Sequence, residues 1–192
     1  MSGVRLIGLL TLVPALYCVS GLAAEPGSSE TRLHAQAAGV AERFAGTLKP
    51  ELQQALVSGG AVVAVAVCAT RAPAIARELS ETTGWQVRRV SLKPRNRELA
   101  TPDAWEAEQL AALARRQAVN DGSDTLTATA QVDGRFRFMK AQVTEPLCLT
   151  CHGTQVAHEV AAVLRTYYPD DAAMGYAAGQ VRGAISVSRS LP

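Results

Sequence analysis

The chain has 192 residues, of which 48% are hydrophobic and 19% are charged. This composition is typical of a globular domain and excludes a disordered chain, and the length suffices for one domain with its own core. The formal net charge of +2 provides no strongly basic face, so the composition gives no reason to expect nucleic-acid binding.

Residues 1–24 have the three parts of a secretory signal peptide. Arg5 supplies a short positive region, residues 6–16 are apolar, and residues 22–24 form a cleavage site. The alternative is an uncleaved membrane anchor over residues 4–24, which are just long enough to span a bilayer. The small residues at the end favour cleavage. The sequence therefore predicts an exported, periplasmic bacterial protein, or a membrane-anchored one that faces the periplasm.

The first third of the mature chain predicts helices separated by proline and glycine. Residues 31–48 carry apolar side chains at helical spacing, after a polar linker over residues 25–30. Lys49-Pro50 interrupts this helix, and a second short helix over residues 50–57 ends at Gly59-Gly60.

A run of β-branched and small residues follows at positions 61–67. It predicts a strand that is buried on both faces and ends at Cys68. Residues 73–82 form a helix that starts at a proline and ends at Gly84. Residues 85–92 are the next predicted strand, and a loop dense in positive side chains follows it.

Thr101 and Pro102 predict the start of a helix, with the threonine as N-cap and the proline at the first position. We expect this helix to run to about residue 119 and to end near Gly122. A β-hairpin follows, in which Asp133-Gly134 joins two alternating runs over residues 126–132 and 136–143.

A helix over residues 155–167 and a strand over residues 183–189 complete the chain. The total is about five strands with helices between them. The predicted fold class is therefore α+β, with a mostly antiparallel sheet and packed helices in one domain over residues 31–192.

The segment Cys148-Leu149-Thr150-Cys151-His152 is the attachment motif of c-type haem. Two thiols at this spacing can each form a thioether with one of the two vinyl groups of the haem. His152 is then placed to coordinate the iron as the proximal ligand. The motif predicts one covalent haem c.

Three other interpretations compete with haem. The first is a chance match. The second is a thioredoxin-like redox pair, which usually follows a strand in a βαβ unit, whereas a polar segment broken by Pro146 precedes this motif. The third is a zinc site, which would need four ligands and usually a second pair of cysteines.

The chain has four cysteines, and Cys18 leaves with the signal peptide. The motif uses two of the remaining three, so Cys68 is left without a partner. A single thiol in an oxidising compartment can be a buried core residue, pair with another chain or bind something, and a haem iron is an obvious candidate.

The chain resembles a family of exported c-type haem domains with a PAS-like fold. The matching stretches run in order over nearly the whole mature chain: APAIA (72–76), RVSLKPRN (89–96), PDAWE (102–106), CLTCHG (148–153), YPDDA with GY (168–172, 175–176) and RGAISV (182–187). Arg97 and Leu99 stand where the family usually has proline and asparagine, and Gln180 stands where it prefers an acid.

The resemblance implies that the iron is held by His152 on one side and Cys68 on the other. An anionic thiolate stabilises ferric iron, so the reduction potential should be low. Reduction or protonation could weaken the sulfur bond and open a site for a diatomic gas. Met139, Met174 and His158 are the other candidates for the sixth ligand.

The two propionates of a haem need cationic or polar partners. Arg89, Lys93, Arg95 and Asn96 are the nearest such residues along the chain, and the alternative for each is a solvated basic loop. We expect Asp170-Asp171 to form a turn after the preceding helix rather than an acid/base pair.

Redox or gas sensing is the first function that these predictions support, and periplasmic electron transfer is the alternative. A sensor of this size would act through a signalling protein, and an electron carrier through a redox partner. No enzymatic activity is expected, because the sequence offers no clear distal acid/base pair for a peroxidase. Membrane association is expected only if the signal stays uncleaved.

Overall fold

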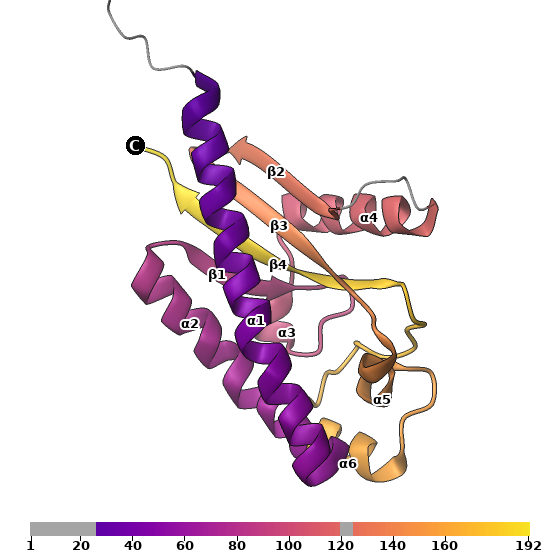
Figure 1. Cartoon of the computed structure of the whole chain (residues 1–192). Helices are drawn as coiled ribbons and strands as arrows, with labels where there is room; N and C mark the ends of the chain where they lie inside the picture. Colours follow the sequence, from indigo (N-terminus) through magenta and orange to yellow (C-terminus); the bar gives the residue numbers. More distant parts are fainter. Residues whose placement is uncertain (1–25, 120–124) are drawn as a thin grey trace, which may run out of the picture.

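The computed structural model describes residues 26–119 and 125–192. In these ranges it holds a four-stranded antiparallel sheet in the order β1-β4-β3-β2 (Figure 1). The strands are β1 (Gln86–Val90), β2 (Thr127–Val132), β3 (Arg135–Val143) and β4 (Val181–Ser190). The predicted α+β class with an antiparallel sheet is confirmed. The signal peptide predicted over residues 1–24 and the helix end near Gly122 lie outside the described residues.

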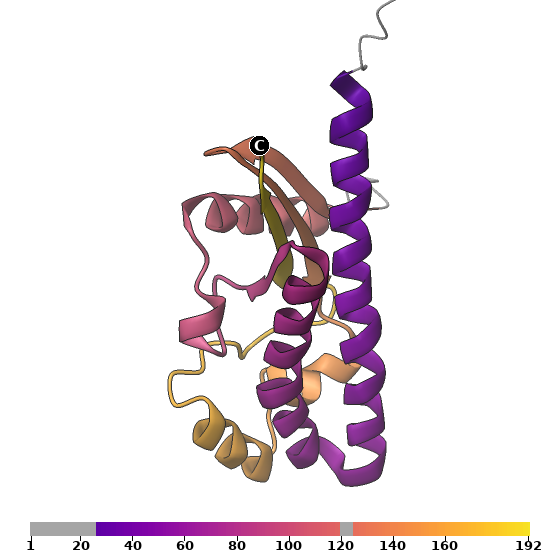
Figure 2. The ribbon, with the colours of Figure 1, turned by 90° about the vertical axis from the view of Figure 1, so that its left-hand side faces the viewer.

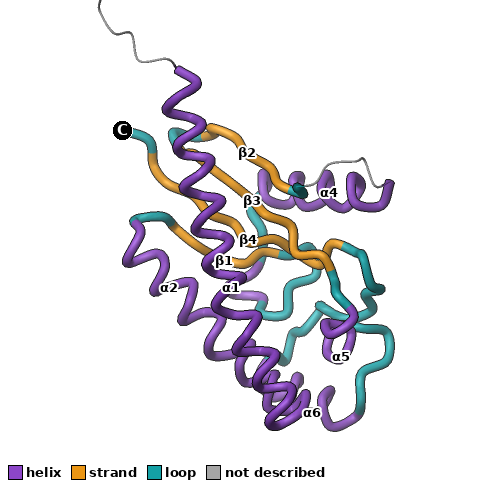
Figure 3. The backbone as a smooth tube through the Cα atoms, viewed as in Figure 1, coloured by secondary structure: helices purple, strands orange, loops and turns teal. Residues whose placement is uncertain are grey.

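Helices pack on both faces of this sheet. The helical segments of the described ranges are α1 (Pro26–Ala66), a π-helical turn (Val67–Arg71), α2 (Ala72–Thr83), α3 (Arg97–Ala100), α4 (Ala104–Val119), a 3-10 turn (Pro146–Cys148), α5 (Leu149–His152) and α6 (His158–Tyr167). Seen from the side, the sheet lies between α1 and α4 (Figure 2). Most loop segments lie at the end of the sheet nearest α5 (Figure 3).

The main core forms where α1 crosses the sheet. Apolar residues of α1 recur every three or four positions and are buried: Ala37, Val40, Ala41, Phe44 and Leu48. They meet alternate residues of the two central strands, including Phe136 and Phe138 of β3 and Ile185 and Val187 of β4. Side chains alternate between the faces of a strand, so these residues form one apolar surface.

The opposite face of the sheet packs on α4. Met139, Leu110, Val90 and Ala184 form its buried cluster. Glu106 is also buried there, where it accepts a hydrogen bond from Ser186 Oγ at 2.7 Å.

The strand predicted over residues 61–67 is wrong, because residues 61–66 form the last turns of α1 and Val67 begins the π-helical turn. Val62 and Val63 are 38% and 46% exposed, whereas Ala64 and Val65 are buried, which is a helical pattern. Val65 packs against α6 residues rather than against a strand. A short continuous apolar run does not distinguish a strand from a helix by periodicity alone. Cys68 therefore lies in the π-helical turn, and the sheet has four strands in the described ranges rather than about five.

The predicted interruption at Lys49-Pro50 is also wrong, because α1 continues through Pro50. Proline removes one helical hydrogen bond, but Leu48 and Ala55 on either side are buried and hold the helix against its neighbours. The break comes at Gly60, where φ is 70° and ψ is −170°, as the Gly59-Gly60 pair predicts. The helix begins at Pro26, inside the predicted linker over residues 25–30.

Local signals placed the hairpin and most helix ends correctly. Asp133 and Gly134 both have positive φ, at 51° and 67°, as a tight hairpin turn with the twist of its strands requires. Gly84 ends α2 in the left-handed conformation. The N-cap of α4 is Asp103 rather than Thr101, since Asp103 Oδ1 accepts from Glu106 N and Glu106 Oε2 accepts from Asp103 N, both at 2.9 Å.

The helical segment from residue 29 to residue 83 contains a stretch that is long and apolar enough to cross a membrane. Core helices of soluble proteins and signal sequences can have the same length and hydropathy. The stretch is therefore weak evidence for a membrane span.

A matched pair of glycine substitutions tests this packing. A Cβ at Gly183 in β4 would lie 2.6 Å from the Val90 carbonyl oxygen, whereas a Cβ at Gly46 in α1 meets nothing within 4 Å. We expect Gly183→Ala to destabilise the protein by about 1–3 kcal/mol through overpacking. Gly46→Ala should stabilise it by about 0.5–1 kcal/mol, since alanine favours helix. Urea unfolding measures both, and equal midpoints would contradict the packing described.

Candidate functional site

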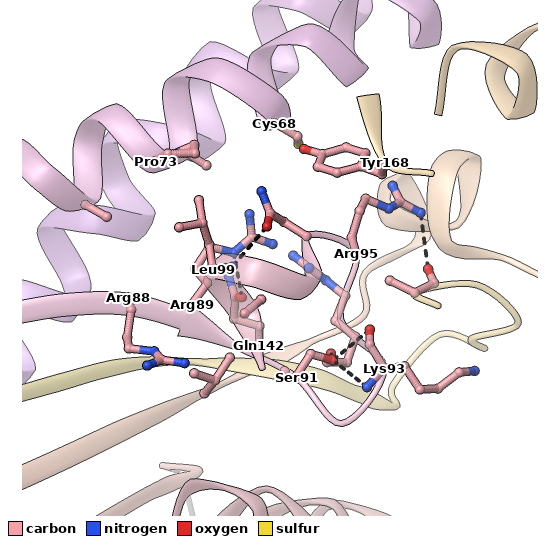
Figure 4. A pocket seen from close by; sticks show the side chains of 18 of the residues that line it. Cys68, Pro73, Arg88, Arg89, Ser91, Lys93, Arg95, Leu99, Gln142 and Tyr168 are labelled. Carbon is pink, nitrogen blue, oxygen red and sulfur yellow. Dashed lines mark hydrogen bonds between the residues drawn. The ribbon is translucent and has the colours of Figure 1, made fainter. Parts of the chain in front are cut away.

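Two adjoining cavities lie between the sheet, the π-helical turn and the loops around α5. Figure 4 shows residues that line the larger one. Their volumes are about 330 Å³ and about 50 Å³. The residues that line both are Cys68, Arg89, Arg95, His152, Tyr168 and Arg182. Small-molecule sites usually occupy 300–1,000 Å³, so the cavities together can hold a ligand of cofactor size.

The haem motif lies after β3, where a 3-10 turn is followed directly by the single-turn helix α5. Cys148 closes the 3-10 turn, and Cys151 and His152 end α5. Both cysteines are half-buried free thiols that line the smaller cavity. A Cβ at Gly153 would lie 2.6 Å from the Leu149 carbonyl oxygen, so this turn requires a glycine directly after the histidine.

His152 is held as a neutral imidazole. Its Nδ1 lies 2.7 Å from the Ala173 carbonyl oxygen, which can only accept, so Nδ1 carries the proton and Nε2 keeps a free lone pair. Burial lowers the pKa of His152 to about 2, and the charges of Arg95 and Arg182 act in the same direction. A histidine that ligates a metal typically donates its other N–H to a carbonyl in this way.

Cys68 faces the same cavities as His152, although 84 positions separate the two residues in the sequence. Its π-helical turn joins α1 to α2, and such turns occur often at functional sites. In Figure 4 its side chain lies beside Tyr168 at one end of the larger cavity. The π-helical turn and the motif therefore supply one thiol and one imidazole to a common space.

The alternatives to haem find less support in this geometry. Burial raises the pKa of the Cys151 thiol, whereas a redox-active pair of the thioredoxin type needs a lowered one. In the described part of the chain, no group of three or more histidine, cysteine or acidic side chains is placed to hold a metal ion. A zinc site would need four such ligands.

Two arginines from neighbouring strands bring positive charge into the cavities. Arg89 of β1 donates from Nε to Gln142 Oε1 at 3.2 Å. The Nε of Arg182 in β4 is buried, and no described residue forms a hydrogen bond with it. Burial and the nearby Arg182 lower the pKa of Arg89 to about 10. No acidic side chain in the described part of the chain forms an ion pair with Arg89 or Arg182, and two such neighbouring cations favour an anionic ligand.

The other predicted donors for propionates are engaged elsewhere. Arg95 donates from Nη2 to the Cys151 and Ala173 carbonyl oxygens and forms an ion pair with Asp171. Lys93 is exposed, with its Nζ 4.6 Å from the centre of the Tyr176 ring.

Asn96 accepts from Leu99 N at 3.0 Å and caps α3. Arg89 is thus the predicted propionate partner with the most N–H donors that are not used in other hydrogen bonds.

Arg182, Tyr168 and Gln142 are site residues that no sequence motif predicted. All three line the larger cavity, and burial raises the pKa of Tyr168 to about 12. A shift in the β3–β4 pairing between Gln142 and Val143 marks a strand irregularity beside the cavity. Gln142 and Arg182 come together because β3 pairs with β4, whereas Tyr168 reaches the cavity from the end of α6. Tyr168 and Arg182 lie in stretches that resemble the haem family, but no local motif marks either as a site residue.

The other candidate ligands lie away from the cavities. Met139 is buried on the α4 face of the sheet, as expected for a core residue. His158 is exposed at the start of α6, and neither it nor Met174 lines either cavity. Trp105 packs on the α4 face, and Tyr176 contacts the edge of the His152 ring at 6.4 Å between centroids.

Comparison with known proteins identifies related chains. The crystal structure of the cyanobacterial heme-protein Tll0287 matches with a TM-score of 0.59 and 22% sequence identity, covering 87% of this chain and 97% of that one. It shows that the two chains share a fold. No curated protein sequence matches. A family model described as Tll0287-like matches residues 23–190, and the chain therefore belongs to the Tll0287-like family.

Proposed function

We propose that this protein binds one haem covalently, through thioethers to Cys148 and Cys151, with His152 as the proximal iron ligand. The haem motif, the neutral imidazole and the adjoining cavities support this assignment. A solved relative that shares the fold is named as a heme-protein. The haem would supply one-electron exchange at iron and a site for a small ligand.

The residues around the cavities fit such a group. Apolar side chains of α2, β1 and α3 line the larger cavity: Ala72, Pro73, Ala76, Val87, Val90 and Leu99. Arg89 and Arg182 provide guanidinium donors that have no anionic partner among the described residues, which suits the two propionates.

We propose that Cys68 is the distal ligand and that the protein senses redox state or a diatomic gas. The observation that carries this proposal is the shared lining of both cavities by Cys68 and His152. A thiolate stabilises ferric iron, so its release on reduction would open a coordination position. The signal would then pass to a partner protein.

A binding role is preferred to catalysis. Among the described residues that line the cavities there is no carboxylate and no histidine besides His152. The distal acid/base groups most often used are a histidine or a carboxylate, and the described lining of these cavities supplies neither opposite His152. The apolar segment over residues 1–24 supports a place in the periplasm, where the chain would meet its partner.

Replacing both motif cysteines, Cys148→Ser and Cys151→Ser, is expected to abolish covalent haem, because serine forms no thioether. The protein is exported from a bacterial host with active haem maturation, and absorbance measures the haem that stays with the denatured chain. Cys68→Ala is the matched control, which removes a third thiol of the same cavity and should keep the haem. Haem on the double-serine variant, or none on the wild-type chain, would contradict the proposal.

Two substitutions at Cys68 test the distal ligand. Cys68→Ala should shift the ferric absorption bands, because the sulfur donor is lost. Cys68→Met should retain a sulfur donor but raise the reduction potential, since a thioether is neutral. Met174→Leu is the control and should leave the spectrum unchanged. If the bands do not move when Cys68 is lost, Cys68 is not a ligand, and a plain electron carrier becomes the better assignment.

Arg182→Gln tests the anion site through two opposite effects on stability. In the unloaded double-serine protein the substitution should stabilise the fold, because it removes an unpaired positive charge from the cavity. In the haem-loaded protein it should destabilise the fold by about 1–3 kcal/mol, because a propionate loses its partner. Arg77→Gln at the exposed rim of the larger cavity is the control. Thermal unfolding of both forms decides, and a change of the same sign in both would contradict the site.

A further inference from the structure

The carbonyl of Ala173 receives two donors of different kinds. His152 Nδ1 approaches it at 2.7 Å, and Arg95 Nη2 donates to it at 3.2 Å. The same Nη2 also donates to the Cys151 carbonyl at 2.5 Å. Arg95 therefore connects the backbone of the haem motif with the acceptor that orients its histidine.

Asp171 holds this arrangement from the other side. Its Oδ1 accepts from the Ala173 backbone N at 2.8 Å, and its Oδ2 lies 3.1 Å from Arg95 Nε. The Arg95 and Asp171 side chains are only 12% and 8% exposed. An ion pair shielded from water keeps a defined geometry and a strong field, and both groups act on the Ala173 peptide.

We propose that Arg95 and Asp171 form a positioning pair that sets the donor strength of His152 and thereby the reduction potential of the iron. This inference rests on the proposed haem binding. It assigns Arg95 a function on the proximal side, in place of the predicted contact with a propionate.

The two residues have opposite effects on the potential. Arg95 donates to the same carbonyl oxygen as His152. This sharing weakens the hydrogen bond from His152 Nδ1–H to that oxygen and makes the imidazole a poorer electron donor to the iron. The positive charge of Arg95 also opposes the additional charge of ferric iron. Both effects favour ferrous iron, so loss of Arg95 should lower the potential. Loss of the Asp171 charge leaves Arg95 uncompensated and should raise it.

The experiment compares Arg95→Gln and Asp171→Asn in the haem-loaded protein by optical redox titration, in which a chemical reductant supplies one electron to each ferric iron. At a fixed potential we expect the ferric-to-ferrous ratio to rise about tenfold in Arg95→Gln and to fall about tenfold in Asp171→Asn, or about 59 mV each way. Arg95→Lys keeps the charge but not the forked contact, so its shift should be smaller.

The matched control is the exposed pair of Glu42 and Lys140. Glu42→Gln and Lys140→Gln remove the same charges at the surface, where solvent screens them, and should leave the potential nearly unchanged. Shifts of the same sign in both site variants would indicate a purely structural role and overturn the inference, as would no shift.

A second measurement does not depend on haem. In the unloaded double-serine protein, Arg95→Gln removes the arginine that shares the Ala173 carbonyl with His152. The hydrogen bond from His152 Nδ1–H to that carbonyl should therefore strengthen. The Nδ1 proton resonance should move to lower field in the NMR spectrum. An unchanged resonance would overturn the inference even if the variant fails to load haem. A wild-type chain without haem would contradict the proposed function, and the potential-setting role would fall with it.

Discussion

The packing of α1 on the two central strands determines where both halves of the site lie. Phe44 and its helical neighbours bury the same sheet face that Phe136 and Phe138 present. Because the helix crosses the sheet and continues beyond it, its end reaches α6 and the loops after β3. This carries Cys68 to the turn that holds Cys148, Cys151 and His152. Without that long-range contact, the thiol and the imidazole would share no cavity.

A second constraint is the positive charge within the cavities. Arg89 and Arg182 project from strands that pair with each other, while Asp171 neutralises Arg95 nearby. Isolated cations in a partly dry site are unfavourable, so the unliganded protein retains a cost that an anionic ligand would relieve. The site is thus better suited to a dianionic cofactor than to a neutral one. The proximal loop differs, because its charges are already paired and serve to hold the backbone.

Local signals predicted most of the fold. Turn glycines, the Asp133-Gly134 hairpin and alternating apolar residues placed all four strands of the described sheet and the ends of α2 nearly where they lie. The failures share one cause. Local patterns at the apolar run over residues 61–67 and at Pro50 carry no information about tertiary neighbours. In the fold, packing against α6 and the sheet keeps both segments helical. The predicted N-cap at Thr101 is wrong because Asp103, two positions later, caps the helix through reciprocal hydrogen bonds with Glu106.

The sequence by itself determined which residues are available for the proposed haem attachment, because the two thiols and the imidazole of the motif are neighbours in sequence and need no tertiary contact to be recognised. It also singled out Cys68 by the count of cysteines. Only the tertiary structure decided which charged groups face the site. Arg182 lines the site, and Arg95 donates to the Ala173 carbonyl. Side-chain partners depend on strand register and on loops that meet across the fold, and neither has a local signature in the residues themselves.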